Sequence, residues 1–153
     1  MSVVGAVVSL VVTFGAAAIG GRFLPDQWYR ALRKPEWNPP NWLFGPVWTV
    51  LYLMMAAAAW LIWRKYGIAS AIVPLGFFVL QLALNAMWSW LFFGRHEIRA
   101  ALIDLGLLWL AILVTIVLFW GRETLAGVLL VPYLGWVSFA GVLNATILRL
   151  NPS

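Results

Sequence analysis

Charged side chains divide this chain into five long uncharged intervals. The ten Lys and Arg residues and the five Asp and Glu residues stand in short clusters. The intervals between these clusters approach or exceed the ~20 residues that a helix needs to cross a membrane, whereas a strand of a membrane barrel would have ~10 residues of alternating polarity. The pattern therefore predicts an all-α integral membrane bundle of five transmembrane helices. Trimmed at Pro and Gly, the predicted spans are Val3–Gly20, Leu43–Trp63, Ile68–Phe93, Ala100–Trp120 and Leu125–Leu148.

The composition agrees with a membrane protein and excludes several other classes. Hydrophobic residues make up 64% of the chain and charged residues 10%, whereas soluble domains have about 45–50% and about 25%. The absence of cysteine excludes a disulfide framework, a thiolate metal site and a thiol nucleophile. The net charge of +5 is not gathered into the clustered basic face that nucleic acid requires. We therefore expect membrane lipid, and no nucleic acid, as a partner.

Basic residues are unequally divided between the two sides of the predicted bundle. The segments that follow the first, third and fifth spans carry seven Lys and Arg residues, and the other side carries three. The positive-inside rule therefore places the N-terminus outside and the C-terminus in the cytoplasm. This orientation favours a bacterial inner membrane and leaves an outer membrane open. A cleaved signal peptide ending near Ala16–Ala18 is disfavoured, because no basic residue precedes Arg22.

Only one predicted connection is long, and it covers residues Gly21–Trp42. Loops longer than ~12–15 residues are usually functional or disordered. This loop carries three Trp residues and a Tyr, which are too many membrane anchors for a free tether. We expect a short helix over Asp26–Lys34 with Asp26 as its N-cap, and Asn41 as the N-cap of the second span. The sequence therefore predicts a long ordered loop that covers this end of the bundle.

Tryptophan is concentrated near this loop. Of the eleven Trp residues, Trp60, Trp63 and Trp120 lie at the opposite interface and are typical of an aromatic belt. Six others lie on the loop side, and Trp136 lies near the middle of the last span. The sequence therefore predicts an aromatic pocket beneath the loop. The six loop-side residues are Trp28, Trp37, Trp42, Trp48, Trp88 and Trp90.

Polar and aromatic residues recur at helical spacing on one face of three spans. An amide side chain in hydrocarbon is costly unless it is paired, so Asn85 and Asn144 should face inward. Two interpretations stay open for these amides: they line a cavity, or they hold helices together. The faces are formed by Trp48, Tyr52 and Met55 in the second span, Gln81, Asn85 and Trp88 in the third, and Tyr133, Trp136, Ala140 and Asn144 in the fifth.

Residues suited to catalysis or metal binding are few. His96 is the only histidine, and with Arg95 and Glu97 beside it we expect a solvated loop residue. Asp104 is the only carboxylate within a span, and a pairing with Arg99 or a polar neighbour would account for it. No metal-ligand spacing or cofactor motif occurs, so we expect no metal and no cofactor. Proton-driven multidrug export is disfavoured, because no ionisable residue lies at mid-membrane.

Several motifs, spread from Arg22 to Arg149, resemble one known family. They are Trp28-Tyr29, Lys34-Pro35-Glu36-Trp37-Asn38-Pro39-Pro40, Gly45-Pro46-Val47-Trp48, Gln81–Asn85 with Leu91–Gly94, and Pro132–Trp136 through Asn144. Together they resemble the signature of the tryptophan-rich sensory protein or translocator protein (TspO/MBR) family. The resemblance implies a single five-helix domain over residues 1–153, often a homodimer, that binds porphyrins and other flat hydrophobic ligands beneath its first loop.

The resemblance also assigns individual residues. In some bacterial members, the tryptophans that match Trp48 and Trp136 are linked to light-dependent porphyrin degradation, so these two are candidate catalytic residues if this protein degrades porphyrin. Sterol binding is less expected, because Ala145 stands where the sterol motif of the animal members has an aromatic residue. The implied ligand-binding residues are Tyr29, Trp37, Trp48, Tyr52, Asn85, Trp88, Trp136, Phe139, Ala140 and Asn144.

The chemistry of these residues agrees with a porphyrin ligand. A tetrapyrrole is a flat apolar disc with carboxylates at one edge, and indole faces stack well on such a disc. Arg30, Arg33 or Lys34 in the loop is suited to meet the carboxylates. The leading hypothesis is therefore a membrane binding protein or sensor for porphyrins such as protoporphyrin IX, with transport as an extension. The alternative is an enzyme that degrades porphyrin in the light.

Overall fold

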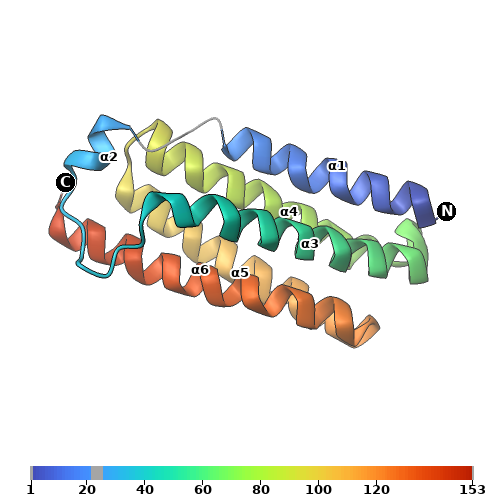
Figure 1. Cartoon of the computed structure of the whole chain (residues 1–153). Helices are drawn as coiled ribbons and strands as arrows, with labels where there is room; N and C mark the ends of the chain where they lie inside the picture. The colour runs from blue at the N-terminus through green and yellow to red at the C-terminus, as the bar shows by residue number, and fades with distance from the viewer. Residues whose placement is uncertain (1, 22–25, 153) are drawn as a thin grey trace.

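Five long apolar helices run side by side along the molecule, as the sequence predicts (Figure 1). The computed structural model describes residues 2–21 and 26–152. A short helix, α2 (Gln27–Ala31), lies in the first loop, and a π-helical turn, η1 (Trp90–Gly94), extends α4. The described ranges contain no strand, so the chain is an all-α, multi-pass membrane protein. The five long helices are α1 (Ser2–Gly20), α3 (Asn41–Ser70), α4 (Ile72–Ser89), α5 (Ile98–Arg122) and α6 (Thr124–Leu150).

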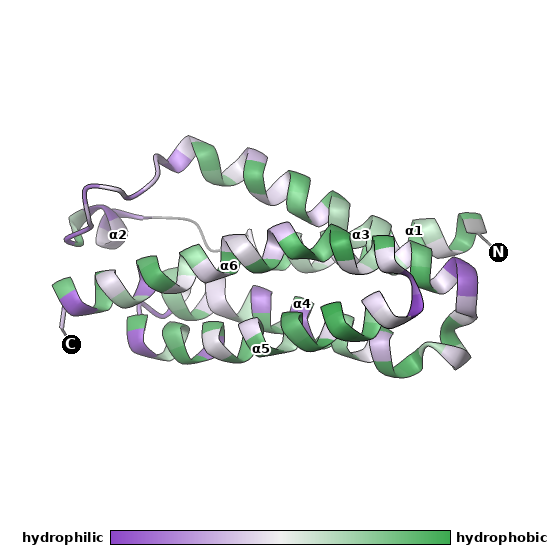
Figure 2. Ribbon diagram, turned by 90° about the horizontal axis from the view of Figure 1, so that it is seen from below, coloured by the Kyte–Doolittle hydropathy of each residue, from purple (hydrophilic) through white to green (hydrophobic). Residues whose placement is uncertain are grey.

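The five long helices form a ring around a common core. α1 packs on α3 and α4, and the ring continues from α4 to α5, from α5 to α6 and from α6 back to α3. Met55, Ile62, Phe119 and Leu130 are almost fully buried within it. Many Val, Leu and Ile side chains stay exposed on the outer faces, as a surface that contacts lipid requires. Figure 2 shows hydrophilic residues mainly at the two ends of the bundle and hydrophobic residues along the helices between them.

The turn between the second and third spans agrees with the prediction, although the bounds assigned to the two helices differ from the predicted ones. α3 continues to Ser70 rather than ending at Trp63, and α4 begins at Ile72 rather than at Ile68. The backbone leaves the helical conformation at Gly67, where φ is 75° and ψ is 166°. Glycine has no Cβ and adopts a positive φ without strain, so it permits the break. The break therefore lies within residues 64–67, the connection that the sequence predicts, and the helical turn over residues 68–70 beyond it is counted with α3.

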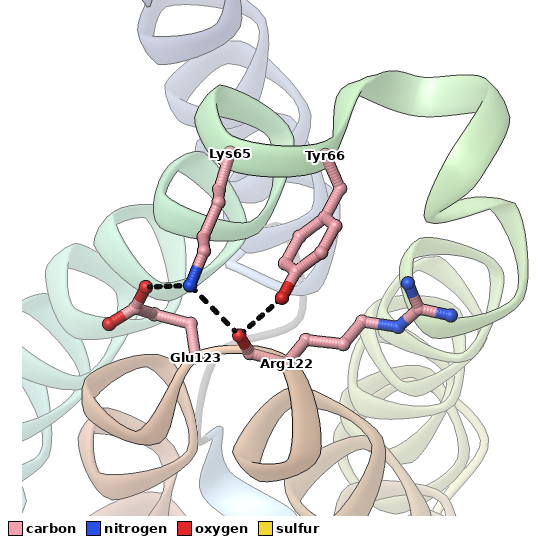
Figure 3. A network of polar contacts seen from close by, with 4 residues as sticks. All are labelled: Lys65, Tyr66, Arg122 and Glu123. Carbon is pink, nitrogen blue, oxygen red and sulfur yellow. Dashed lines mark hydrogen bonds and ion pairs between the residues drawn. The ribbon is translucent and has the colours of Figure 1, made fainter.

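Polar contacts hold the bundle together at the end opposite α2 (Figure 3). The hydroxyl of Tyr66 donates a hydrogen bond to the backbone carbonyl of Arg122 at 2.6 Å. The ammonium of Lys65 lies 3.4 Å from Oε2 of Glu123 and donates to the same carbonyl at 3.4 Å. The guanidinium of Arg122 lies over the ring of Tyr66, 5.3 Å from its centre. These contacts tie the end of α3 to the turn between α5 and α6.

Asp26 is the N-cap of α2, as the sequence predicts. Oδ1 of Asp26 accepts a hydrogen bond from the backbone N–H of Tyr29 at 3.1 Å. The helix ends at Ala31, earlier than predicted, because the backbone of Leu32 is extended with a ψ of 146°. The ammonium of Lys34 then folds back and donates to the backbone carbonyls of Tyr29 at 2.8 Å and Leu32 at 3.2 Å. Lys34 therefore caps the helix from outside it.

The prediction that Asn41 caps the second span is wrong. Pro40 precedes α3 with a φ of −65° and a ψ of 147°, and no side chain caps this helix. Because the proline ring already fixes φ near −65°, Pro40 takes the extended N-cap conformation and Asn41 becomes the first helical residue. The N–H of Leu43 bonds the carbonyl of Pro40 at 3.0 Å. Residues 22–25 lie outside the described ranges, so order throughout the loop stays a prediction.

Candidate ligand cavity

A cavity of about 520 Å³ lies at the α2 end of the bundle. Its volume falls within the range of about 300–1,000 Å³ that is usual for small-molecule sites. Residues from all five long helices, from α2 and from η1 form its wall. None of the residues that form the wall is charged, and most are aromatic or aliphatic. The cavity is therefore suited to an apolar ligand with few charges.

One wall consists of aromatic rings from α3 and α6. Phe44, Trp48 and Tyr52 recur at four-residue spacing on α3, which places them on one helix face. The rings of Trp48 and Tyr52 stack with their centres 5.5 Å apart. Trp136 of α6 meets Trp48 edge to face, with ring centres 6.5 Å apart and an interplanar angle of 88°. Phe44 contacts Trp136 in the same way at 5.9 Å.

A second wall consists of aromatic rings from α4, η1 and α2. Trp88 stacks on Phe92 with ring centres 5.1 Å apart. Phe92 and Phe93, which are consecutive residues of η1, both line the cavity. Tyr29 of α2 packs edge-on against Phe93 at 5.3 Å, which docks α2 on η1. Burial raises the pKa of the Tyr29 phenol, so this residue presents a neutral ring to the cavity.

A chain of hydrogen bonds lies at the base of the cavity. The hydroxyl of Tyr133 donates to Oε1 of Gln81 at 2.6 Å and accepts from Nδ2 of Asn85 at 2.7 Å. Oδ1 of Asn85 accepts from the hydroxyl of Tyr52 at 3.1 Å. Tyr52 and Asn85 line the cavity, whereas Gln81 and Tyr133 do not. The buried amides are therefore paired, and α3, α4 and α6 are joined through their side chains.

Asn144 makes a second link between helices. Its Oδ1 accepts a hydrogen bond from Nε1 of Trp88 at 3.0 Å, and its Nδ2 donates to the backbone carbonyl of Ile98 at 3.2 Å. This side chain is 2% exposed and joins α4, α5 and α6. Asn144 also lines the cavity. Both interpretations of the intramembrane amides therefore hold: Asn85 and Asn144 face inward, line the cavity and connect helices.

Eight of the ten residues that the family resemblance assigns to a ligand pocket line this cavity. Trp37 and Phe139 do not; their rings pack edge to face with centres 5.8 Å apart, and Trp37 is 47% exposed. Phe139 contacts the wall indirectly, with its ring 5.5 Å from that of Trp136. Ligand binding by any of the ten stays a prediction. The eight that line the cavity are Tyr29, Trp48, Tyr52, Asn85, Trp88, Trp136, Ala140 and Asn144.

The sequence predicts an aromatic pocket from the six loop-side tryptophans, but not all six face the cavity. Only Trp48 and Trp88 line it. Trp42 is 72% exposed and Trp90 is 40% exposed, which is typical of anchors at a membrane interface. Trp28 packs on other residues of the loop end. The high count of tryptophan on this side therefore combines a pocket with an ordinary interfacial belt.

Sequence reasoning missed several residues of the wall. Leu143 and Ile147 continue the face of α6 that begins at Trp136, so helical periodicity was the signal that could have found them. Ala17 and Gly20 of α1 also line the cavity. A Cβ added to Gly20 would lie 3.4 Å from Oγ of Ser89, so this glycine lets α1 approach α4 closely. The small residues at the end of α1 thus serve packing within the chain.

The predicted pairing of Asp104 with Arg99 or a polar neighbour is wrong. Asp104 is 4% exposed, and neither of its carboxylate oxygens has a hydrogen-bond partner among the described residues. Arg99 precedes it by five positions, which separates the two side chains by about 140° around the helix, and Arg99 is exposed. Asp104 is also absent from the cavity wall.

Comparison with known proteins decides the family of this chain. Residues 6–150 match the TspO/MBR family. The chain belongs to the TspO/MBR family. The match includes the whole cavity wall, from Ala17 of α1 to Ile147 of α6.

Similar TspO/MBR proteins come from bacteria and from animals. The chain is 42% identical to protein CrtK of Rhodobacter capsulatus over 90% of its own length and 86% of that protein. It is 47% identical to the tryptophan-rich protein TspO of Chlorobaculum tepidum, over 84% of its length and 82% of that protein. It is 41% identical to the human translocator protein, over 87% of its length and 82% of that protein.

Proposed function

We propose that this TspO/MBR protein is a membrane binding protein or sensor for porphyrins, such as protoporphyrin IX, and for other flat hydrophobic ligands. The observation that carries this function is the uncharged cavity of about 520 Å³ with two aromatic walls. A flat apolar disc gains stacking energy on indole and phenyl faces. Two relatives are named tryptophan-rich sensory protein and translocator protein, and these names agree with a role in sensing or translocation.

The polar edge of the ligand would face the α2 end. Arg30 and Arg33 are exposed there and are free to meet carboxylates, whereas the ammonium of Lys34 already donates to backbone carbonyls. Trp48 and Trp136 both line the cavity, and neither indole N–H donates a hydrogen bond to another of the described residues. They are therefore available to an acceptor oxygen of the ligand.

A binding titration tests this function. The substitution Trp48→Ala is expected to weaken protoporphyrin IX binding by about threefold to tenfold, because one aromatic contact of about 0.5–1.5 kcal/mol is lost. The measurement is the absorbance change of the porphyrin during titration in detergent and in the dark. Trp42→Ala is the matched control, because Trp42 lies at the same end of α3 but is 72% exposed. Equal losses in the two variants would exclude a specific role for the cavity.

The contact between Trp48 and Trp136 favours a second candidate function, light-dependent porphyrin degradation at these two residues. Illumination of the porphyrin complex in air is expected to give a distinct product, measured by chromatography. The double variant Trp48→Phe/Trp136→Phe keeps aromatic faces for stacking and is expected to bind porphyrin without forming that product. The same rate of bleaching for free and bound porphyrin would rule this function out.

The assembly and location of the protein are also proposals. We expect a homodimer in a bacterial inner membrane, with the N-terminus outside and the C-terminus in the cytoplasm. We expect little sterol binding, since Ala145 replaces the aromatic residue of the sterol motif.

A further inference from the structure

His96 occupies an unusual position in the turn between η1 and α5. Its φ is 58°, and it is the one non-glycine residue with a positive φ in the described ranges. Asn, Asp and His adopt this left-handed conformation more readily than other side chains, but it is uncommon for each of them. The side chain of His96 is 38% exposed, as the sequence predicts for a loop residue. It is nevertheless held by two contacts from another element.

Both contacts come from the start of α2. Nε2 of His96 lies 3.0 Å from Oδ2 of Asp26. The imidazole ring stacks on Trp28 with ring centres 4.2 Å apart and an interplanar angle of 13°. The other oxygen of Asp26 accepts the backbone N–H of Tyr29, so one carboxylate caps α2 and bonds the histidine. His96, Asp26 and Trp28 therefore clamp α2 to the turn between η1 and α5.

Few other charges act on this clamp. The hydrogen bond from the backbone of Tyr29, and to a smaller extent the contact with His96, lower the pKa of Asp26 against the opposing effect of burial, and His96 is the only titratable side chain of the described residues that contributes. The two charged neighbours of His96 in its own turn, Arg95 and Glu97, pair with each other at 3.4 Å. The charge of the His96–Asp26 contact is therefore set mainly by these two residues.

The clamp acts on the wall of the cavity. Tyr29 follows Trp28 in α2, is 4% exposed and lines the cavity. Its ring rests on Phe92 and Phe93 of η1, the element that leads directly to His96. A change in the contact between His96 and Asp26 therefore changes how firmly α2 covers this end of the cavity.

We propose that the His96–Asp26 contact, stacked on Trp28, is a pH-sensitive latch that holds α2 over the cavity. Histidine side chains change charge between about pH 5 and 8. A protonated imidazole makes a charged pair with the ionised Asp26, and it also stacks more strongly on an indole. A neutral imidazole makes a weaker hydrogen bond to a carboxylate than a protonated one does, so the latch is expected to weaken as the pH rises. Because the pKa of Asp26 is lowered, its carboxylate stays ionised to below the ordinary range of an aspartate, and the pair is lost only when that carboxylate is protonated.

The absence of cysteine permits a direct measurement of α2. Spin labels are attached at Ala31→Cys in α2 and Arg99→Cys in α5, both of which are exposed. The distance distribution between the labels is expected to be narrow at pH 6 and to broaden at pH 8.5. The variant His96→Asn tolerates the left-handed φ but lacks the imidazole, so its distribution is expected to be broad at both pH values. A pH response that persists in His96→Asn would overturn the latch.

Two further variants separate charge from structure. Asp26→Asn keeps a good N-cap and removes the charge, because asparagine is as favourable as aspartate at that position. It is expected to reduce the pH response to the part that stacking on Trp28 contributes. Glu97→Gln breaks the neighbouring ion pair and is expected to leave the response unchanged. If Asp26→Asn keeps the full response, the charged pair is not the origin of the effect and the proposal fails.

A second measurement, which rests on the proposed function, tests whether the latch slows the release of porphyrin from the cavity. In the dark, protoporphyrin IX is expected to dissociate about twofold to fivefold faster at pH 8.5 than at pH 6, which is the range expected of an exposed charged pair. His96→Asn supplies the baseline, because the porphyrin itself titrates. If the distance between the two spin labels does not change with pH in the protein that keeps His96 and Asp26, the latch is overturned, whether or not porphyrin binds. A distance that changes with pH in a protein that does not bind porphyrin supports the latch and contradicts the proposed function.

Discussion

Filling the cavity at Ala140 is expected to weaken porphyrin binding by about tenfold to a hundredfold. Ala140 lines the cavity on α6, one turn after Trp136. The substitution Ala140→Phe places a phenyl ring in space that the ligand would occupy. A ligand that must share this space with the phenyl ring loses about 1–3 kcal/mol of binding free energy. The ring also covers the stacking surface of Trp136. The measurement is a titration with protoporphyrin IX in detergent, in the dark.

A matched control for this result lies on the same helix. Ala145 is exposed on α6, so Ala145→Phe makes the same chemical change on a face that contacts lipid. Its porphyrin affinity is expected to stay within about twofold of the unsubstituted protein. Thermal unfolding of both variants shows whether either has lost its fold. If the two variants are folded and bind porphyrin equally, the ligand lies outside the cavity.

The substitution Tyr133→Phe is expected to lower the free energy of unfolding by about 1–3 kcal/mol. It removes a hydroxyl that donates to Gln81 and accepts from Asn85. Gln81 is buried away from the cavity, so its Oε1 would lose a partner without gaining water, and Nδ2 of Asn85 would lose its acceptor. A hydrogen bond between two membrane helices often contributes less than this to stability, ~0.6 kcal/mol on average. Here one hydroxyl satisfies two buried amides at once, which places the expected effect above that average.

Tyr66→Phe provides the comparison for this prediction. Tyr66 lies at the opposite end of the bundle and loses one hydrogen bond, to the carbonyl of Arg122. Both variants can be unfolded in the same detergent by a denaturant titration. Tyr133→Phe is expected to unfold at the lower denaturant concentration. If Tyr66→Phe is equally or more destabilising, the chain of hydrogen bonds at the base of the cavity is not a major source of stability.

The distribution of charges predicted the membrane fold well. Because charged residues are excluded from hydrocarbon, the clusters around Arg64 and Arg122 bounded the spans to within a few residues. Local chemistry also predicted the cap at Asp26, because a short carboxylate ahead of a helix satisfies a free backbone N–H. The same rule failed at Asn41, since the proline before it already held the extended conformation.

Parts of the cavity required the tertiary structure. Helical periodicity predicted that Asn85 and Asn144 face inward, but it contains no information on which side chain on another helix each would bond. Nor did it identify Phe92 and Phe93 of η1 as residues that line the cavity wall. The count of loop-side tryptophans overstated the pocket, because Trp42 is turned outward although its sequence context is equally aromatic.

The central claim is that a flat tetrapyrrole occupies the cavity between the aromatic walls. The most direct measurement is an experimental structure of the protein with protoporphyrin IX, prepared in the dark so that no degradation occurs. The disc is expected to lie against Trp48, Trp136 and Trp88, with its carboxylate edge toward Arg30 and Arg33 at the α2 end. A porphyrin found on the outer, lipid-facing surface of the helices, with the cavity empty, would contradict the account.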